Sequence, residues 1–154
     1  MKSIRHSGIV VSNLKRSLYF YRNLLGFRII KKAKEDGRYI DTLLGGKGIV
    51  VTTVKMACDD GNLIELLYFH APNKDKKKER RAFDFGISHL ALTVSNLDKE
   101  YHRLSGKGIE FISEPQLSPD GKVKVVFCKD YDNVLIELVE PLQVKFKSNP
   151  SYKE

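Results

Sequence analysis

The sequence predicts an α+β protein in which a strand, a helix and about three further strands occur twice in tandem. Two internal matches support this prediction. Residues 4–14 align without a gap with residues 87–97, with six of eleven positions identical, and residues 60–66 align with 132–138, with five of seven identical. Because both matches occur in the same order in each half, we interpret the chain as a duplicated module.

The length and the repeat together set the expected domain organisation. A chain of 154 residues suits one compact domain spanning 1–154, because single domains usually have about 100–150 residues. Within it we expect a first module over 4–69, a linker over 70–86, a second module over 87–141 and a polar tail over 142–154.

In the first module, the strand that contains His6 is followed by a helical pattern of apolar residues. This pattern predicts a helix over 12–25, with Ser12 as its N-cap and Gly26 as its end. The rest of the module has the composition of short strands, which we expect at 27–31, 39–44, 50–55 and 63–69.

The second module repeats this order. Ser95 is the expected N-cap of a helix that ends at Gly106, and Asp98 occupies a capping-box position three residues after Ser95. Further strands are expected at 109–111, 123–128 and 134–139.

One histidine recurs in the first strand of both modules. Side chains alternate across a strand, so His6 shares a face with Gly8, and His89 shares a face with Ala91 and Thr93. We expect the more apolar faces of these strands to pack against the helices. The histidines then lie on faces with small neighbours, which is typical of a pocket.

One glutamate recurs in the last strand of each module, Glu65 in Leu-Ile-Glu-Leu-Leu and Glu137 in Leu-Ile-Glu-Leu-Val. Burying an unpaired carboxylate costs on the order of several kcal/mol. Neither strand contains Lys or Arg, so a divalent cation bound by both glutamates and both histidines would satisfy all four groups. A lone strand histidine is more often a structural residue, and a lone strand glutamate often faces solvent. The joint recurrence favours metal binding.

The formal net charge of +8 by itself suggests a negatively charged partner such as nucleic acid. No helix-turn-helix, zinc-finger or RNP-like motif accompanies the charge, so we expect no nucleic-acid partner. No apolar run approaches the ~20 residues that span a bilayer, and we expect neither a secretory signal nor a membrane partner. Because Cys58 and Cys128 are the only cysteines, we expect a cytoplasmic protein.

Several motifs extend over about residues 4–141 and carry a family resemblance. They are Ile4-Arg5-His6, Val11-Ser12-Asn13-Leu14, residues 20–27, residues 86–94, Phe127-Cys128-Lys129-Asp130 and Leu135-Ile136-Glu137-Leu138. Together they resemble the vicinal oxygen chelate superfamily, which includes glyoxalase I, methylmalonyl-CoA epimerase, extradiol dioxygenases, and fosfomycin and bleomycin resistance proteins. The resemblance implies two βαβββ modules whose mixed sheets curl into a cup around one divalent metal ion.

The resemblance also implies a ligand set and a reaction. The ligands would be His6, Glu65, His89 and Glu137, and the ion would be Ni, Zn, Co, Mn or Fe. This set most resembles that of glyoxalase I. It implies a lyase or isomerase that transfers a proton α to a carbonyl through a metal-stabilised enediolate, acting on a small thioester or hemithioacetal. Glu137 or Glu65 would be the general base, the histidines would be ligands only, and the protein would be a homodimer.

Other functions stay open. They are an epimerase of the methylmalonyl-CoA type, a metal-free small-molecule binding protein of the drug-resistance type, and an extradiol dioxygenase. It is also open whether one chain or two supply the four ligands. The Asp-Pro-Asp-Gly turn common in the family reads Asp130-Tyr131-Asp132-Asn133 in this chain.

The basic residues are concentrated in two segments, 14–34 and 74–81. They form either a solvated face or a rim that attracts an anionic substrate, such as a thiol or CoA conjugate.

Overall fold

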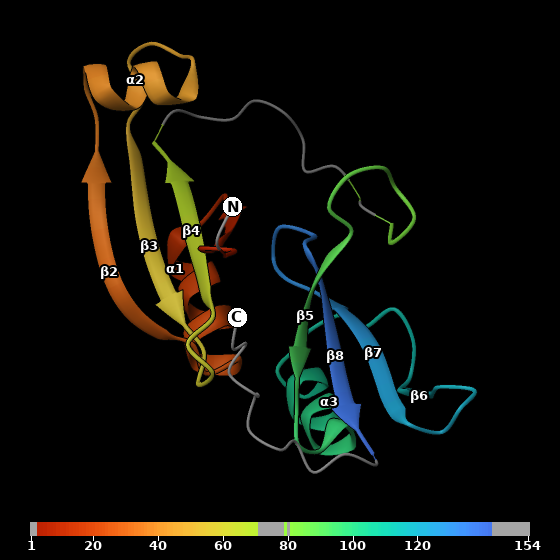
Figure 1. Cartoon of the computed structure of the whole chain (residues 1–154). Coiled ribbons are helices and arrows are strands. Elements are labelled where there is room, and N and C mark those ends of the chain that lie inside the picture. Colours follow the sequence, from red (N-terminus) through yellow and green to blue (C-terminus); the bar gives the residue numbers. More distant parts are fainter. Residues whose placement is uncertain (1–2, 71–78, 80, 143–154) are drawn as a thin grey trace, which may run out of the picture. The chain divides into compact units, whose positions relative to one another are not determined.

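The computed structural model describes residues 3–70, 79 and 81–142, which form two compact units (Figure 1). One unit contains the described residues up to Glu79 together with Tyr131–Asn133, and the other contains the remaining described residues. Each unit is built on one four-stranded mixed sheet. No helix among these described residues has the length and apolar character needed to span a membrane.

The first unit has the sheet order β1-β4-β3-β2. β1 and β4 are parallel, whereas the β4–β3 and β3–β2 pairs are antiparallel. Its elements in chain order are β1 (Ser7–Val10), α1 (Leu14–Leu18), the π-helix η1 (Tyr19–Leu24), β2 (Arg28–Glu35), α2 (Arg38–Leu44), β3 (Val51–Ala57) and β4 (Leu63–Phe69).

The second unit has the equivalent order β5-β8-β7-β6. Again the first strand is parallel to the last strand of the unit, and the other pairs are antiparallel. Its elements are β5 (His89–Thr93), α3 (Leu97–Ser105), β6 (Gln116–Leu117), β7 (Val123–Lys129) and β8 (Leu135–Pro141). The predicted α+β class with two tandem βαβββ modules is therefore confirmed.

The core of the first unit lies on the sheet face opposite His6, as strand parity predicted. Ile9 and Leu66 are buried on that face, where the helical segment supplies Phe20 and Tyr21. These two aromatic rings meet edge to face with their centroids 5.0 Å apart, and both residues are fully buried.

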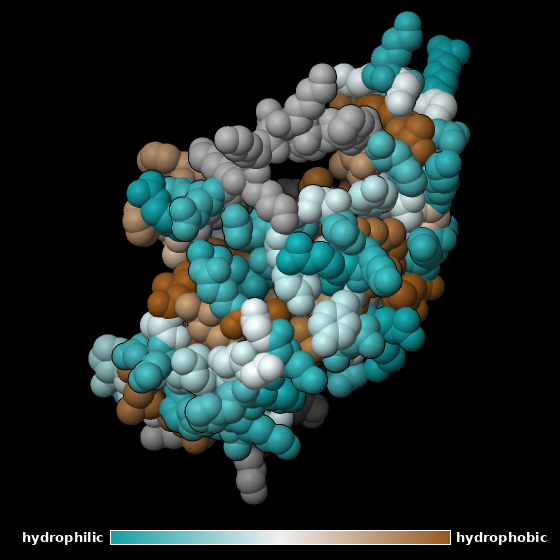
Figure 2. All heavy atoms as spheres, turned by 180° about the vertical axis from the view of Figure 1, so that it is seen from behind, coloured by the Kyte–Doolittle hydropathy of each residue, from teal (hydrophilic) through white to brown (hydrophobic). Residues whose placement is uncertain are grey.

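Polar residues cover much of the face seen in Figure 2, with apolar patches between them. Several large apolar side chains of the described residues are exposed, among them Tyr39, Phe83 and Phe85.

Two predicted strands are wrong. Residues 39–44 belong to α2, in which Ile40 is buried and Gly45 ends the helix in a left-handed conformation (φ 67°). The apolar positions Ile40, Leu43 and Leu44 have helical spacing, and glycines on both sides allow the chain to turn sharply. Residues 109–111 form only the bridge Phe111–Cys128, while the short strand β6 was not predicted.

The predicted N-caps are each displaced by one residue. Asn13 caps α1 by accepting a hydrogen bond from the backbone N–H of Arg16 (3.1 Å), and Asn96 caps α3 through the N–H of Lys99 (2.9 Å). Ser12 instead donates its hydroxyl and its N–H to the two carboxylate oxygens of Asp132, at 2.5 and 3.0 Å. Serine and asparagine are both good caps, so only the backbone geometry decides between neighbours.

The long predicted helix over 12–25 is divided into α1 and η1, and it ends before Gly26, whose φ of 84° requires a glycine-like conformation. Most of the predicted linker, 71–78 and 80, and the predicted tail from residue 143 onward lie outside the described residues. The basic segment 74–81 is therefore described only at Glu79 and Arg81.

Candidate functional site

The first unit brings His6 and Glu65 together. The parallel pairing of β1 with β4 places Gly8 opposite Glu65, and His6 lies two residues earlier on the same face. The His6 Nε2 is 3.1 Å from the Glu65 Oε2, and the Glu65 side chain is only 13% exposed. The contact therefore pairs an imidazole with a carboxylate that has lost most of its access to water.

The second unit repeats this arrangement with His89 and Glu137. The pairing of β5 with β8 places Ala91 opposite Glu137, and His89 again lies two residues earlier. The His89 Nε2 is 3.0 Å from the Glu137 Oε2. The same register and nearly the same contact distance recur in the sheets of both units, so this histidine–glutamate pair is a property of the module.

The other ring nitrogen of each histidine has a different environment. His6 Nδ1 is buried and has no hydrogen-bond partner among the described residues. His89 Nδ1 lies 3.1 Å from the Ser88 hydroxyl oxygen, and the His89 ring packs edge-on against Phe127 with centroids 5.1 Å apart. In both pairs the Nε2 is the nitrogen directed at the carboxylate.

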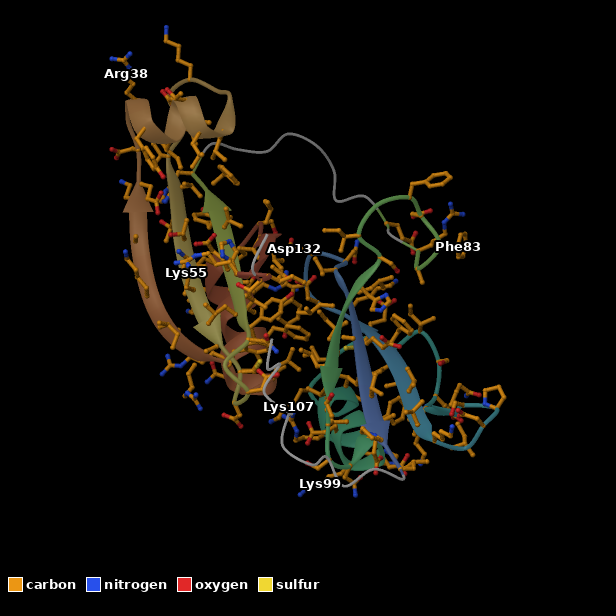
Figure 3. The ribbon with its side chains drawn as sticks, viewed as in Figure 1. Arg38, Lys55, Phe83, Lys99, Lys107 and Asp132 are labelled. Atoms are coloured by element: carbon orange, nitrogen blue, oxygen red, sulfur yellow. The ribbon has the colours of Figure 1, made fainter. Side chains whose placement is uncertain are left out.

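The structure adds Lys55, which was not among the sequence candidates. On β3, Lys55 is the direct cross-strand neighbour of Glu65, and its Nζ is 3.5 Å from the Glu65 Oε1 (Lys55 is labelled in Figure 3). Neither β4 nor β8 contains Lys or Arg, as the sequence shows, but the adjacent strand β3 supplies Glu65 with a positively charged neighbour. At the equivalent position of the second unit, Phe127 faces Glu137.

The two cysteines do not have the properties of nucleophiles. Burial, followed by the hydrogen bond to Asp60 and the charge of that carboxylate, raises the pKa of the Cys58 thiol to about 11. Burial and the nearby charge of Asp130 raise the pKa of Cys128 to about 12. Since the thiolate is the reactive form, these raised pKa values disfavour a nucleophilic role for either cysteine near neutral pH.

The remaining histidines, His70 and His102, lie apart from these pairs in sequence position and in contacts. His70 Nε2 is 2.9 Å from the Thr52 hydroxyl, and His102 is exposed on α3 beside Tyr101.

The donor types in the two pairs fit a divalent transition metal. Neutral imidazole and carboxylate are typical ligands of zinc, nickel, cobalt, manganese and iron. The His6 Nε2 faces the Glu65 carboxylate and is therefore the nitrogen that would bind a metal ion beside it. The Nδ1 of His6, which has no partner among the described residues, is not required for metal binding. Among residues 3–70, 79 and 81–142, no three His, Cys, Asp or Glu side chains form one metal-binding group. One module thus supplies two donors, which is half of a four-ligand set.

The turn before β8 reads Asp130-Tyr131-Asp132-Asn133 where the family motif has Asp-Pro-Asp-Gly. Asn133 has a φ of 64°, in the left-handed region, at the position where the family motif has glycine. Asparagine tolerates this conformation better than other residues with a side chain. Asp132, in the same turn, accepts the two hydrogen bonds from Ser12.

A family model for the Glyoxalase/Bleomycin resistance protein/Dioxygenase superfamily matches residues 3–138. The chain therefore belongs to this superfamily, whose members typically bind a divalent metal ion and act on small molecules.

Individual relatives and structures agree with this membership. The uncharacterized protein YwkD of Bacillus subtilis is 33% identical over 91% of this chain and 98% of its own length. A lactoylglutathione lyase of Schizosaccharomyces pombe is 31% identical over 96% of this chain, which spans 50% of that enzyme. The crystal structure of a glyoxalase family protein from Bacillus cereus has a TM-score of 0.83 at 22% identity, covering 92% of this chain and 95% of that one.

Proposed function

We propose that this protein is a metal-dependent lyase or isomerase of the glyoxalase I type, which transfers a proton next to a carbonyl group in a small thioester or hemithioacetal. In this proposal His6, Glu65, His89 and Glu137 together bind one divalent ion, and the active protein is a homodimer.

The observation that carries the proposal is the repetition of one histidine–glutamate pair at the same register position of both sheets, with Nε2–Oε2 distances of 3.1 and 3.0 Å. The residue types of the pair recur although the residue opposite the glutamate differs, Lys55 in one module and Phe127 in the other. The resemblance to a lactoylglutathione lyase over nearly the whole chain supports the reaction class.

When bound, the ion supplies Lewis-acid stabilisation of the negative charge that develops on a substrate oxygen. His6 and His89 have the role of neutral ligands through their Nε2 atoms. The charges of two carboxylates and a divalent ion sum to zero, and the neighbouring Lys55 ammonium adds one positive charge, which suits a neutral or an anionic substrate.

Glu137 is the better candidate for the general base. It has one ionic partner among the described residues, His89, and is 21% exposed. Glu65 contacts His6 through one oxygen and Lys55 through the other, and it is more buried. Glu137 can therefore turn toward a substrate carbon, accept its proton and return the proton to the neighbouring carbon, at a smaller loss of existing contacts than Glu65.

The test is metal analysis followed by a proton-exchange assay. The purified protein is stripped with a chelator, reloaded with Ni²⁺, Zn²⁺, Co²⁺, Mn²⁺ or Fe²⁺, and its metal content is measured. Each form is then incubated in deuterated water with a panel of hemithioacetals and acyl-CoA thioesters, and NMR follows product formation and exchange at the α-carbon. We expect one bound ion for each chain, that is, for each set of four ligands. We expect turnover only in the metal-loaded protein. A protein that binds no divalent ion would contradict the proposal.

One observation favours a second candidate, a metal-free small-molecule binding protein. The Lys55 ammonium already provides Glu65 with a positive partner, so the negative charge of this carboxylate is balanced without a metal ion. The same panel distinguishes the two functions, because a binding protein retains its ligands after chelation and exchanges no α-proton.

A further inference from the structure

Three neighbouring strands of the first unit align one acidic and two basic residues in a single cross-strand row. Glu65 on β4 is paired with Lys55 on β3, and Lys55 is paired with Lys31 on β2. Directly opposite residues project from the same face of a sheet with Cβ atoms about 5 Å apart. The row therefore lies on the face that also carries His6.

The charges in this row are not balanced. Glu65 is the partner of Lys55, while Lys31 is exposed and has no ion pair within the described part of the chain. Like charges placed directly opposite on neighbouring strands repel each other. The row therefore has one more positive than negative charge, that of Lys31, on the sheet face that carries His6 and Glu65. Such an excess of positive charge is typical of an anion-binding surface.

The second unit lacks this feature. Its equivalent row runs from Glu137 on β8 to Phe127 on β7, and the next row on the same face pairs Val139 with Val125, which faces Gln116 on β6. No basic residue occupies these positions. The two modules repeat the histidine–glutamate pair but differ directly opposite the glutamate, where the first has Lys55 and the second has Phe127. A lysine on the same face of the second unit, Lys129, lies in the row of His89 instead and forms an ion pair with Glu110.

Lys55 also competes with a metal ion for the same carboxylate. Its Nζ is 3.5 Å from Glu65 Oε1, and its side chain is 33% exposed, so it has access to solvent while it is paired. A divalent ion that binds Glu65 takes the negative charge that Lys55 now contacts. The lysine is then left close to the ion with no acidic partner, an arrangement that an additional anion would stabilise.

We propose that Lys55, assisted by Lys31, binds an anionic group of the substrate, a carboxylate or a phosphate-like oxyanion, beside the first histidine–glutamate pair. This inference rests on the proposed metal-dependent function and adds a substrate feature to it. Lys55 is the specificity-determining residue of this anion-binding position in the first module.

The test measures binding rather than turnover. Ni²⁺ is titrated into the metal-free protein by calorimetry, and sulfate, a divalent oxyanion that coordinates Ni²⁺ weakly, is then titrated into the loaded protein at low ionic strength. The variants are Lys55→Met, Lys55→Arg and Lys31→Met. Lys124→Met is the matched control, because Lys124 also lies on a strand and forms an ion pair, with Asp98, but belongs to β7 of the second unit.

We expect Lys55→Met to bind Ni²⁺ several-fold more tightly than the unmodified protein and sulfate at least tenfold more weakly. Lys55→Arg should restore sulfate binding, because it retains the positive charge. Lys31→Met, at an exposed position where loss of folding is not expected, should weaken sulfate binding by about threefold through the lost charge. Lys124→Met should match the unmodified protein in both titrations.

Two results would overturn the inference, and they differ in what they say about the proposed function. If Ni²⁺ binds normally but sulfate affinity is unchanged in Lys55→Met and Lys31→Met, the lysines are only structural and the metal-dependent function stands. If the unmodified protein binds no divalent ion, both proposals fail, because Lys55 is never released from Glu65.

Discussion

Lys55 is the direct cross-strand neighbour of Glu65, with its Nζ 3.5 Å from Oε1, whereas Phe127 occupies the same position opposite Glu137. The two glutamates of the duplicated module therefore have different surroundings although their histidine contacts are nearly identical. Glu65 is held by contacts with both His6 and Lys55, whereas Glu137 contacts His89 and is freer to move toward a substrate.

Replacing Glu137 with glutamine should reduce turnover by at least about 100-fold, the lower range expected for loss of a general base. The amide retains the size of the side chain, so thermal unfolding followed by circular dichroism should change little. Steady-state rates with the most active substrate of the panel provide the measurement. Glu65→Gln is the comparison, and we expect it to impair metal binding more than Glu137→Gln does. Full activity in Glu137→Gln would rule out Glu137 as the base.

Removing either histidine should abolish stabilisation by metal. Divalent ion present at 100 times its Kd stabilises a protein with one such site by about 2.7 kcal/mol, which is readily seen as a rise in the melting temperature. We expect His6→Ala and His89→Ala to lose this rise, and His102→Ala to keep it, because His102 is an exposed residue of α3 whose ring packs beside Tyr101. A full metal-dependent rise in both His6→Ala and His89→Ala would refute the ligand assignment.

Asn96, not Ser95, should determine the stability of α3. The Asn96 side chain accepts a hydrogen bond from the N–H of Lys99 at 2.9 Å. Loss of such a cap typically costs about 1 kcal/mol. Urea unfolding of Asn96→Ala should show this loss, whereas Ser95→Ala should lie within about 0.5 kcal/mol of the unmodified protein, as expected for a surface substitution. The opposite ranking would restore Ser95 as the cap.

The Cys58 thiol should react slowly with alkylating reagents. Burial and the contact with Asp60 raise its pKa from 9.0 to about 11, so the thiolate is the minor form until the pH approaches that value. At pH 8 the thiolate fraction is about one in a thousand, and labelling should accelerate as the pH rises.

Asp60→Asn removes the negative charge beside the thiol, so we expect a lower pKa of Cys58 and several-fold faster labelling at pH 8. Mass spectrometry of the labelled peptide distinguishes Cys58 from the buried Cys128. Asp59→Asn is the matched control, because Asp59 pairs with Arg28 instead of the thiol. Equal labelling rates in the two aspartate variants would show that Asp60 has no influence on Cys58.

Much of the site could be predicted because duplication repeats a local pattern. Strand alternation placed His6 and His89 on the faces opposite the helices, and the recurrence of Glu65 and Glu137 linked each histidine to a carboxylate. These features depend on spacing along one strand, which the order of residues determines directly.

Features that depend on contacts with neighbouring segments were harder to predict from the sequence. Residues 39–44 have an apolar content that suits either a strand or a short helix, and the glycines at 37 and 45 make the helical conformation possible. A run this short does not have the length to separate the two periodicities.

The sequence by itself determined the duplicated α+β fold, the two recurring histidines and the two recurring glutamates. Only the tertiary structure decided which side chains surround them. Lys55 lies ten positions before Glu65 in the chain, and its contact with that carboxylate arises from the register between β3 and β4. Register is set by turn geometry and by packing across the whole sheet, so a cross-strand ion pair is not encoded in the spacing of either strand alone.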